Sequence, residues 1–252
     1  MTDAREAEFD LVAEWTRQAV RQLGDDHALP AACQGSASPA ALDWLADACR
    51  VASGTRLLDV GGGTGGPAAY VLRRFGARPL VVEPMPGACR TARELFGLPV
   101  VVGTGEALPI ATGAFKAAWC LGVLCTTPHR PVLLRELRRV LAGGGDLGLL
   151  VFEQCAARLP DTPEGNDFPT AAELDGQLHA AGFVVVDRTP YEELAPAPQS
   201  WSERADRVSA AVAAEHGTDP RHRTALDQQQ RIAKLLDDGA IGGELVHARA
   251  VT

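Results

Sequence analysis

The sequence predicts an α/β fold built on a mainly parallel sheet. Short apolar segments alternate with longer amphipathic ones between residues 56 and 152, and this alternation is typical of βαβ units. Two strand segments, 79–82 and 147–152, are almost continuously apolar, as parallel strands covered by helices on both faces should be. A glycine cluster between the first strand and the next helix adds a tight turn where a ligand can lie against bare backbone.

Two helices are expected before the sheet. Apolar residues recur at spacings of three and four over 6–23, and Gly24 ends this helix. Ser38 and Pro39 form an N-cap and first-turn pair for a second helix over 40–51, after a loop over 28–39. The following segments are predicted as strands at 56–60, 78–83, 99–102, 117–121, 146–152 and 183–186, and as helices at 66–75, 86–96, 130–141 and 170–181.

The chain changes in character after residue 186. Prolines mark a linker, two helical patterns follow, and a last strand comes near the end of the sequence: Pro190, Pro196 and Pro198, then 201–216 and 220–238, then 243–251. We therefore predict one domain over 1–252. Its parts are an N-terminal helical lid at 1–52, a cofactor-binding core at 53–189, a helical insertion acting as a substrate lid at 190–239, and the last strand at 240–252.

Composition limits the classes of function. The 252 residues are 46% hydrophobic and carry a net charge of −8, which disfavours nucleic acid and anionic membrane surfaces as partners. Six cysteines lack the spacing of metal ligands or of a disulfide framework, so we expect reduced thiols and no metal. We find neither a signal-peptide pattern nor an apolar run of about 18 residues. We expect a cytoplasmic protein, monomeric or homodimeric, that acts on a small molecule.

The stretch LLDVGGGTGGP, residues 57–67, carries the strongest signal for a cofactor. Gly61, Gly63 and Gly66 satisfy the G-x-G-x-x-G spacing of dinucleotide sites, and the helix behind them offers unpaired N–H groups at its N-terminus. Glu83 ends the second strand about 20 residues further on, where a carboxylate can accept hydrogen bonds from both ribose hydroxyls. These features predict an adenosine-type cofactor and leave two candidates, a nicotinamide dinucleotide and S-adenosylmethionine.

Asp59 helps to separate these candidates. It stands two residues before the first glycine, where its carboxylate would repel a pyrophosphate. S-adenosylmethionine has no phosphate, and its sulfonium and α-ammonium groups are favoured by a nearby carboxylate. The sequence therefore favours a methyltransferase over an NAD-dependent oxidoreductase. A cofactor-binding protein without catalysis is the third hypothesis.

Four motifs then follow in an order found in one enzyme family. LLDVGGGTGGP at 57–67, VVEPM at 81–85, GTGEALP at 103–109 and AGGGDLGLLVFE at 142–153 resemble the motifs of class I S-adenosylmethionine-dependent methyltransferases, in the branch that acts on small molecules of natural-product type. The resemblance covers roughly residues 56–153. It implies a Rossmann-like, seven-stranded, mostly parallel sheet with helices on both faces and an antiparallel last strand. It also implies methyl transfer to an O, N or C atom in biosynthesis, with S-adenosylhomocysteine as product.

By this resemblance, each part of the cofactor meets particular residues. The methionyl part is lined by Asp59, Gly61, Gly63 and Gly65, the ribose is held by Glu83, the adenine packs on Met85, and the site also includes Thr104, Gly105, Glu106, Cys120 and Leu121. Thr104 departs from the family, because similar sequences have Asp at this position. Either the Thr104 hydroxyl, Glu106 or the backbone holds the adenine edge.

Further candidates lie where this fold places its substrate. A general base is needed only if the acceptor loses a proton, and Glu153 and His129 are the candidates for that role. Four more side chains are expected at the substrate, as a loop polar group, a packing residue and two apolar walls of the lid: Gln34, Cys125, Trp15 and Trp201.

Overall fold

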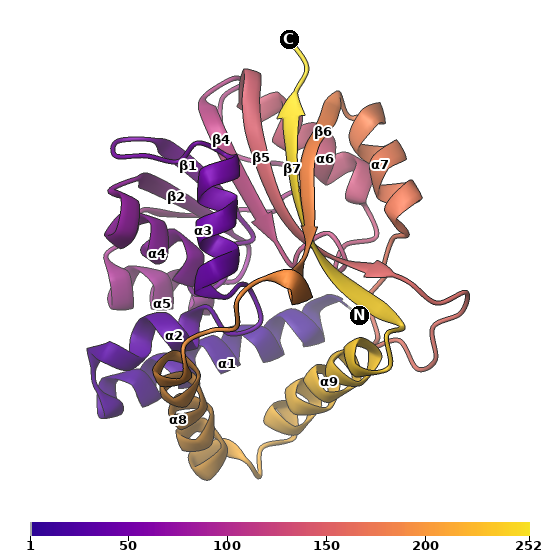
Figure 1. Cartoon of the computed structure of the whole chain (residues 1–252). Helices are drawn as coiled ribbons and strands as arrows, with labels where there is room; N and C mark the ends of the chain where they lie inside the picture. Colours follow the sequence, from indigo (N-terminus) through magenta and orange to yellow (C-terminus); the bar gives the residue numbers. More distant parts are fainter. Residues whose placement is uncertain (1) are drawn as a thin grey trace.

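The computed structural model of the protein describes residues 2–252, with side chains from residue 9 onward (Figure 1). One seven-stranded sheet runs through the molecule in the order β3-β2-β1-β4-β5-β7-β6. Its strands are β1 (Arg56–Val60), β2 (Arg78–Glu83), β3 (Val100–Val102), β4 (Phe115–Leu121), β5 (Leu141–Gln154), β6 (Phe183–Pro190) and β7 (Ile241–Ala250).

Strand β7 lies between β5 and β6 and runs antiparallel to both, with Leu149 opposite Val246 and Val184 opposite Arg249. Parallel pairing joins β1 to β2 and to β4, β2 to β3, and β4 to β5. The Rossmann-like sheet with an antiparallel last strand is therefore confirmed. The loops after β1, β2 and β4 all leave from the same edge of the sheet.

Helices cover both faces of this sheet. Helices α3 (Pro39–Ala48), α4 (Gly66–Phe75) and α5 (Pro86–Phe96) lie on one face, and α6 (Arg130–Val140) and α7 (Ala171–Ala180) lie on the other. Within β1, Leu57 belongs to the buried cluster of Leu42 on α3, whereas Leu58 belongs to that of Leu133 on α6. Burial on two faces explains why the strands are continuously apolar.

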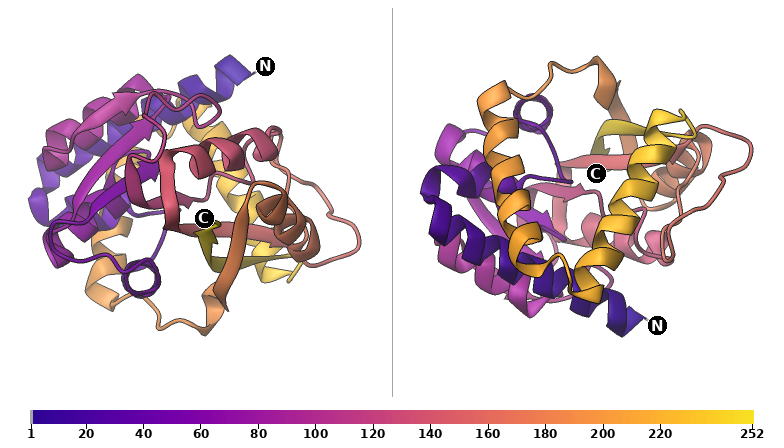
Figure 2. Two further views of the ribbon diagram at one scale, coloured as in Figure 1. Left: turned by 90° about the horizontal axis from the view of Figure 1, so that it is seen from above. Right: turned by 90° about the horizontal axis from the view of Figure 1, so that it is seen from below.

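A third group of helices crosses the edge at which the parallel strands end. It consists of α1 (Thr2–Leu23), α2 (Ala28–Ala32), α8 (Gln199–His216) and α9 (Pro220–Asp237). Figure 2 shows α8 and α9 from below as two arms, with α1 running across them. Trp15, Ala28 and Val208 belong to one buried cluster that joins α1, α2 and α8. Among residues 2–252, no helix is long and apolar enough to cross a membrane.

Three expectations about boundaries were wrong. Residues 28–39 are not all loop, because Ala28 and Ala31 of α2 are buried beside α1 and α8. Strand β5 begins at Leu141 and not at 146, and glycines at 143–145 accommodate a register shift against β4. Strand β6 continues to Pro190, which was expected in a linker. At an edge strand the missing N–H of proline is tolerated.

A charge cluster joins strands at the end of the sheet away from these helices. Asp146 of β5 is buried, and its carboxylate lies 2.9 Å from Nε2 of His247. Arg249 donates to it at 3.2 Å, and Arg50 donates at 2.6 and 3.0 Å. Burial acts to raise the pKa of Asp146, but the hydrogen bonds from His247, Arg50 and Arg249 outweigh burial and leave the pKa lowered.

Asp146→Asn is expected to lower the free energy of unfolding by about 2 kcal/mol near neutral pH, because charge-assisted hydrogen bonds are lost. The folded pKa lies below the unfolded value of about 3.9, so this stability is present above that pH and is lost as the pH falls through the folded pKa. Urea unfolding of both proteins across the acid range measures the difference. A difference that stays constant down to the most acid pH would contradict this assignment.

Candidate functional site

The glycine turn between β1 and α4 is tightly packed at its base. Gly61 has a φ of +70°, and a Cβ placed on it would lie 2.4 Å from Cγ2 of Val123. Only glycine combines this backbone angle with this contact. A Cβ on Gly63, by contrast, would meet nothing within 4 Å. The turn is therefore closed toward the protein and open at Gly63, where a ligand can approach it.

The chain itself fills the space at the N-terminus of α4. The backbone of Ala32, at the end of α2, comes so close that a Cβ on Gly66 would lie 2.4 Å from the Ala32 carbonyl. The Thr64 hydroxyl donates to the same carbonyl at 3.4 Å, and the backbone N–H of Ala68 donates to Asp59. Dinucleotides bind their pyrophosphate through free N–H groups at this position. In this protein the Ala32 carbonyl and the Asp59 carboxylate lie where the pyrophosphate would bind.

Asp59 lies beneath the turn with a relative exposure of 1%. Burial, and next the charge of Glu83, raise its pKa to about 7, although the Ala68 N–H acts in the opposite direction. Its Oδ2 is buried and has no hydrogen-bond partner among the residues that the structure describes. A buried acceptor without a donor is costly, so this carboxylate is suited to a donor or cation that comes from outside the chain.

Glu83 ends β2 next to the turn and is 2% exposed. Its Oε2 accepts a hydrogen bond from the N–H of Gly63 at 2.9 Å, and its Oε1 accepts one from Met85 at 3.1 Å. The carboxylate therefore links the glycine turn to the loop before α5.

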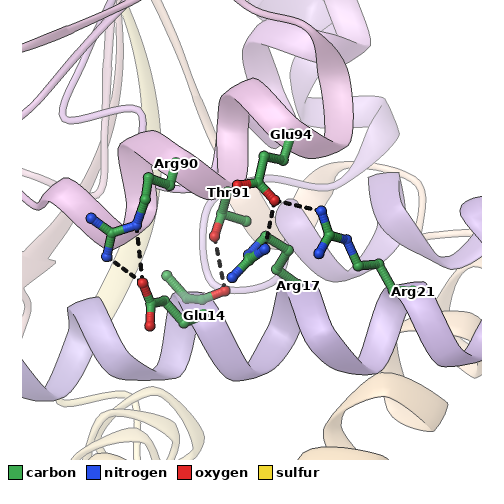
Figure 3. Close-up of polar contacts among 7 residues, drawn as sticks. Glu14, Arg17, Arg21, Arg90, Thr91 and Glu94 are labelled. Atoms are coloured by element: carbon green, nitrogen blue, oxygen red, sulfur yellow. Dashed lines mark hydrogen bonds and ion pairs between the residues drawn. The ribbon is translucent and has the colours of Figure 1, made fainter.

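Helix α1 is fastened to α5 beside this loop. Asp10 of α1 accepts hydrogen bonds from the N–H groups of Gly87 and Ala88, at the N-terminus of α5. Further along, Figure 3 shows Glu14 paired with Arg90, Arg17 and Arg21 paired with Glu94, and the Thr91 hydroxyl bonded to the Ala13 carbonyl. These contacts place α1 along α5 and beside its N-terminus, which directly follows Met85.

The other residues predicted at the cofactor lie around the same strand ends. Gly103 donates to the carbonyl of Glu83 at 3.2 Å, which brings the exposed Thr104 and its neighbour Gly105 beside β2. Glu106 accepts a hydrogen bond from the Thr127 hydroxyl at 2.9 Å. Cys120 and Leu121 are buried at the end of β4. The charge of Asp59 contributes, after burial, to a raised pKa at Cys120.

The residues predicted for the lid divide into two places. Trp15 is buried and stacks on His216 at a centroid distance of 4.3 Å. Gln34 accepts a hydrogen bond from Ser209 of α8 at 3.0 Å. Trp201 lies elsewhere, edge-on to Tyr70 of α4 at 6.3 Å. Trp201 also belongs to α8, but it lies near the N-terminal end of that helix and contacts α4, whereas Gln34 and Trp15 contact Ser209 and His216 further along it.

The three candidates beyond the lid have different surroundings. Glu153 is buried on β5, 4.0 Å from Arg188. Burial raises its pKa, and the positive charge of Arg188 acts in the opposite direction. His129 is exposed before α6. Cys125, which is predicted at the substrate, is buried in an apolar cluster with Phe168 and Leu235, and its thiol donates to the Gly122 carbonyl at 3.5 Å.

Sequence reasoning missed two residues of this region. Asp10 gave no signal, because a carboxylate on the polar face of an amphipathic helix is ordinary until α5 is placed against it. His222, 6% exposed and 6.1 Å from the ring of Trp15, gave none either. Among the side chains that the structure describes, from residue 9 onward, no three His, Cys, Asp or Glu gather in a way that could hold a metal ion.

Comparison with known families agrees with this geometry. Residues 58–149, which span β1 to β5, match the family model of a methyltransferase domain. These residues are therefore similar to a methyltransferase domain. The match includes the glycine turn, Asp59 and Glu83, while helices α1, α2, α8 and α9 lie outside it.

Curated relatives resemble about half of this chain or less. An uncharacterized protein of Mycobacterium tuberculosis is 34% identical over 141 residues, 52% of this chain and 47% of that protein. A probable phthiotriol/phenolphthiotriol dimycocerosates methyltransferase of Mycobacterium ulcerans is 34% identical over 135 residues, with the same shares. The methyltransferase GfsG of Streptomyces halstedii is 33% identical over 106 residues, 39% of this chain and 38% of that protein. The chain thus spans about half the length or less of these relatives.

Solved structures show the same fold over more of the chain. The [4+2]-cyclase SpnF covers 84% of this chain and 80% of its own, with a TM-score of 0.66 and 24% identity. A geranyl diphosphate methyltransferase bound to its substrate and sinefungin covers 83% and 76%, with a TM-score of 0.64 and 14% identity. The chain therefore has the class I methyltransferase fold, and at these identities the likeness concerns the fold alone.

Proposed function

We propose that the protein transfers a methyl group from S-adenosylmethionine to a small molecule in biosynthesis. The observation that carries this proposal is the pair of buried carboxylates, Asp59 and Glu83, at neighbouring strand ends. Their negative charge favours a cationic cofactor and disfavours a pyrophosphate. The filled N-terminus of α4 further weakens the oxidoreductase alternative. The matched methyltransferase domain and the methyltransferases among the curated relatives support the same conclusion.

The residues present suit this cofactor. Oδ2 of Asp59 can accept from its α-ammonium group, and Glu83 can accept from both ribose hydroxyls while it holds Gly63 in place. Bound S-adenosylmethionine supplies an activated methyl group on a sulfonium. The contribution of the chain is to position donor and acceptor and to exclude water, and we assign the exclusion of water to α1, α2, α8 and α9. Roles for Glu153 and His129 as general bases, a cytoplasmic location and a monomeric or homodimeric state stay predictions.

A second function is binding of the cofactor without methyl transfer. It is favoured by one observation: a [4+2]-cyclase shares this fold at 24% identity. Incubation with S-adenosylmethionine and a panel of small-molecule acceptors separates the two functions, with S-adenosylhomocysteine formation measured by mass spectrometry. Formation that depends on an acceptor supports methyl transfer. Cofactor binding without such formation across the panel favours the second function.

Glu83→Gln is expected to weaken binding of S-adenosylhomocysteine about 100-fold, because two charge-assisted hydrogen bonds to the ribose become neutral ones. Calorimetric titration measures the affinity. Glu203→Gln, at an exposed position on α8, is the matched control and should bind like the unchanged protein. Equal affinity of both variants would contradict the role of Glu83.

A further inference from the structure

A groove of about 100 Å³ lies between α1, α8 and α9, the three helices that Figure 2 shows from below. Its buried floor is formed by Val208, Val212 and His222. Thr16, Gln34, Ser209 and Gln229 add polar groups along its sides, and the remaining lining residues are aliphatic.

Among residues 9–252, whose side chains the structure describes, no Asp, Glu, Lys or Arg lines the groove. A carboxylate, phosphate or ammonium group placed there would lose hydration without gaining an opposite charge. The ligand that this lining favours is therefore neutral and largely apolar.

His222 is the exceptional residue of this floor. Its ring is buried beside Trp15, and its Nδ1 has no hydrogen-bond partner among residues 9–252. A buried ring nitrogen left unpaired destabilises a protein, so its presence needs a compensating role. A hydroxyl group can pair with Nδ1 in either neutral tautomer of the ring, since a hydroxyl both donates and accepts. A carbonyl or an N–H could pair with only one tautomer.

The segment that joins α2 to α3 connects this groove to the glycine turn. Gln34 lines the groove. Two residues earlier, the Ala32 backbone contacts Gly66, and one residue later the Gly35 carbonyl lies 3.8 Å from a Cβ placed on Gly122, at the end of β4. A molecule held in the groove therefore lies next to the strand ends that hold the proposed cofactor.

We propose that this groove binds the methyl acceptor, and that the acceptor is a neutral, hydroxylated, largely apolar molecule whose hydroxyl bonds to Nδ1 of His222. This inference rests on the proposed function. The volume sets the size of the anchored part, because an apolar cavity of about 150 Å³ holds one benzene molecule. At about 100 Å³ the groove is smaller than such a cavity, so it holds a short branched chain or one edge of a ring, and the rest of the acceptor extends out of it.

Three ring compounds test the proposal on the full-length protein: phenol, toluene and benzoate. Phenol should bind about tenfold more tightly than toluene, the ratio expected for one hydrogen bond to a buried partner. Toluene is the more hydrophobic of the two, so partition alone would give the reverse order. Benzoate should not show saturable binding. Titrations followed by ligand-observed NMR at millimolar concentrations give the three affinities.

His222→Phe keeps a ring of similar size and removes the nitrogen. It should abolish the preference for phenol and leave the toluene affinity within about twofold. It should also raise the thermal midpoint by about 3 °C, because an unpaired buried polar atom is removed. A histidine kept for structural reasons would instead lower the midpoint when replaced. His179→Phe, at an exposed position on α7, is the control and should preserve the phenol preference.

The outcomes separate this inference from the proposed function. S-adenosylhomocysteine is titrated into the same preparations, and its affinity should be equal in His222→Phe and in the unchanged protein. If it binds but phenol is not preferred, if the preference survives in His222→Phe, or if benzoate binds as tightly as phenol, the assignment of the groove is wrong. If S-adenosylhomocysteine itself does not bind, the proposed function is wrong, whatever phenol does.

Discussion

Replacing Asp59 with Asn is expected to make the free protein more stable at about pH 8 and to weaken its binding of S-adenosylhomocysteine about 100-fold. The stability gain follows from the pKa of about 7 in the folded protein, against about 3.9 in the unfolded chain. Ionisation is harder in the folded state, so Asp59 removes stability as the pH rises from the unfolded value through the folded one. We expect the Asn variant to recover about 2 kcal/mol of this lost stability.

The affinity loss has a separate cause. Oδ2 of Asp59 has no partner within the described chain, and its charge is available to the α-ammonium group of the cofactor. Loss of one charge-assisted hydrogen bond in a buried site weakens binding by about two orders of magnitude. Thermal unfolding and calorimetry measure the two effects on one preparation. Asp47→Asn, exposed on α3, should change neither, and an Asp59 variant that behaves like this control would refute both assignments.

Gly66→Ala is expected to destabilise the protein by about 4 kcal/mol, which is large for the addition of one methyl group. The new Cβ would lie 2.4 Å from the backbone carbonyl of Ala32, and a backbone cannot rotate away as the end of a side chain can. Helix α2 would have to move, and with it Gln34. Ala is otherwise preferred to Gly in helices by about 1 kcal/mol, so local propensity predicts the opposite sign.

Gly176→Ala on α7 is the matched control for this change. Gly176 is also helical, and a Cβ there would meet nothing within 4 Å. The control should gain about 0.5 to 1 kcal/mol in stability. Urea unfolding of both variants measures the pair. A small or favourable change at Gly66 would show that α2 does not press on the glycine turn.

Local patterns predicted most of the fold, because most of its signals are local. Strand β1, the turn and helix α4 occur at the predicted residues, since an apolar run, glycines and an amphipathic run adjoin there. Helix α2 escaped prediction because five residues are too few to show a period and it is held by contacts with α1 and α8. Pro190 led to the wrong prediction of a linker, because a proline is tolerated in β6 only through the position of that strand at an edge of the sheet.

The candidate site likewise has a part that could be predicted from local sequence and a part that could not. Asp59 and Glu83 could be predicted because their chemistry follows from their places beside the glycines and at the end of a strand. The residues proposed to surround the substrate could not be predicted, because their positions depend on how helices far apart in the sequence pack together. Two tryptophans with the same prediction ended apart, Trp15 against His216 and Trp201 against Tyr70. His222 becomes meaningful only when α9 is placed across α1.

The central claim is that a buried carboxylate beneath the glycine turn selects a cationic cofactor. Calorimetric titration of the unchanged protein with S-adenosylhomocysteine at about pH 6 and about pH 8 tests it most directly. With a pKa of about 7 for Asp59, the ionised fraction rises about tenfold between these pH values, and the affinity should rise with it. An affinity that does not change with pH, or NADH binding more tightly than S-adenosylhomocysteine, would contradict the claim.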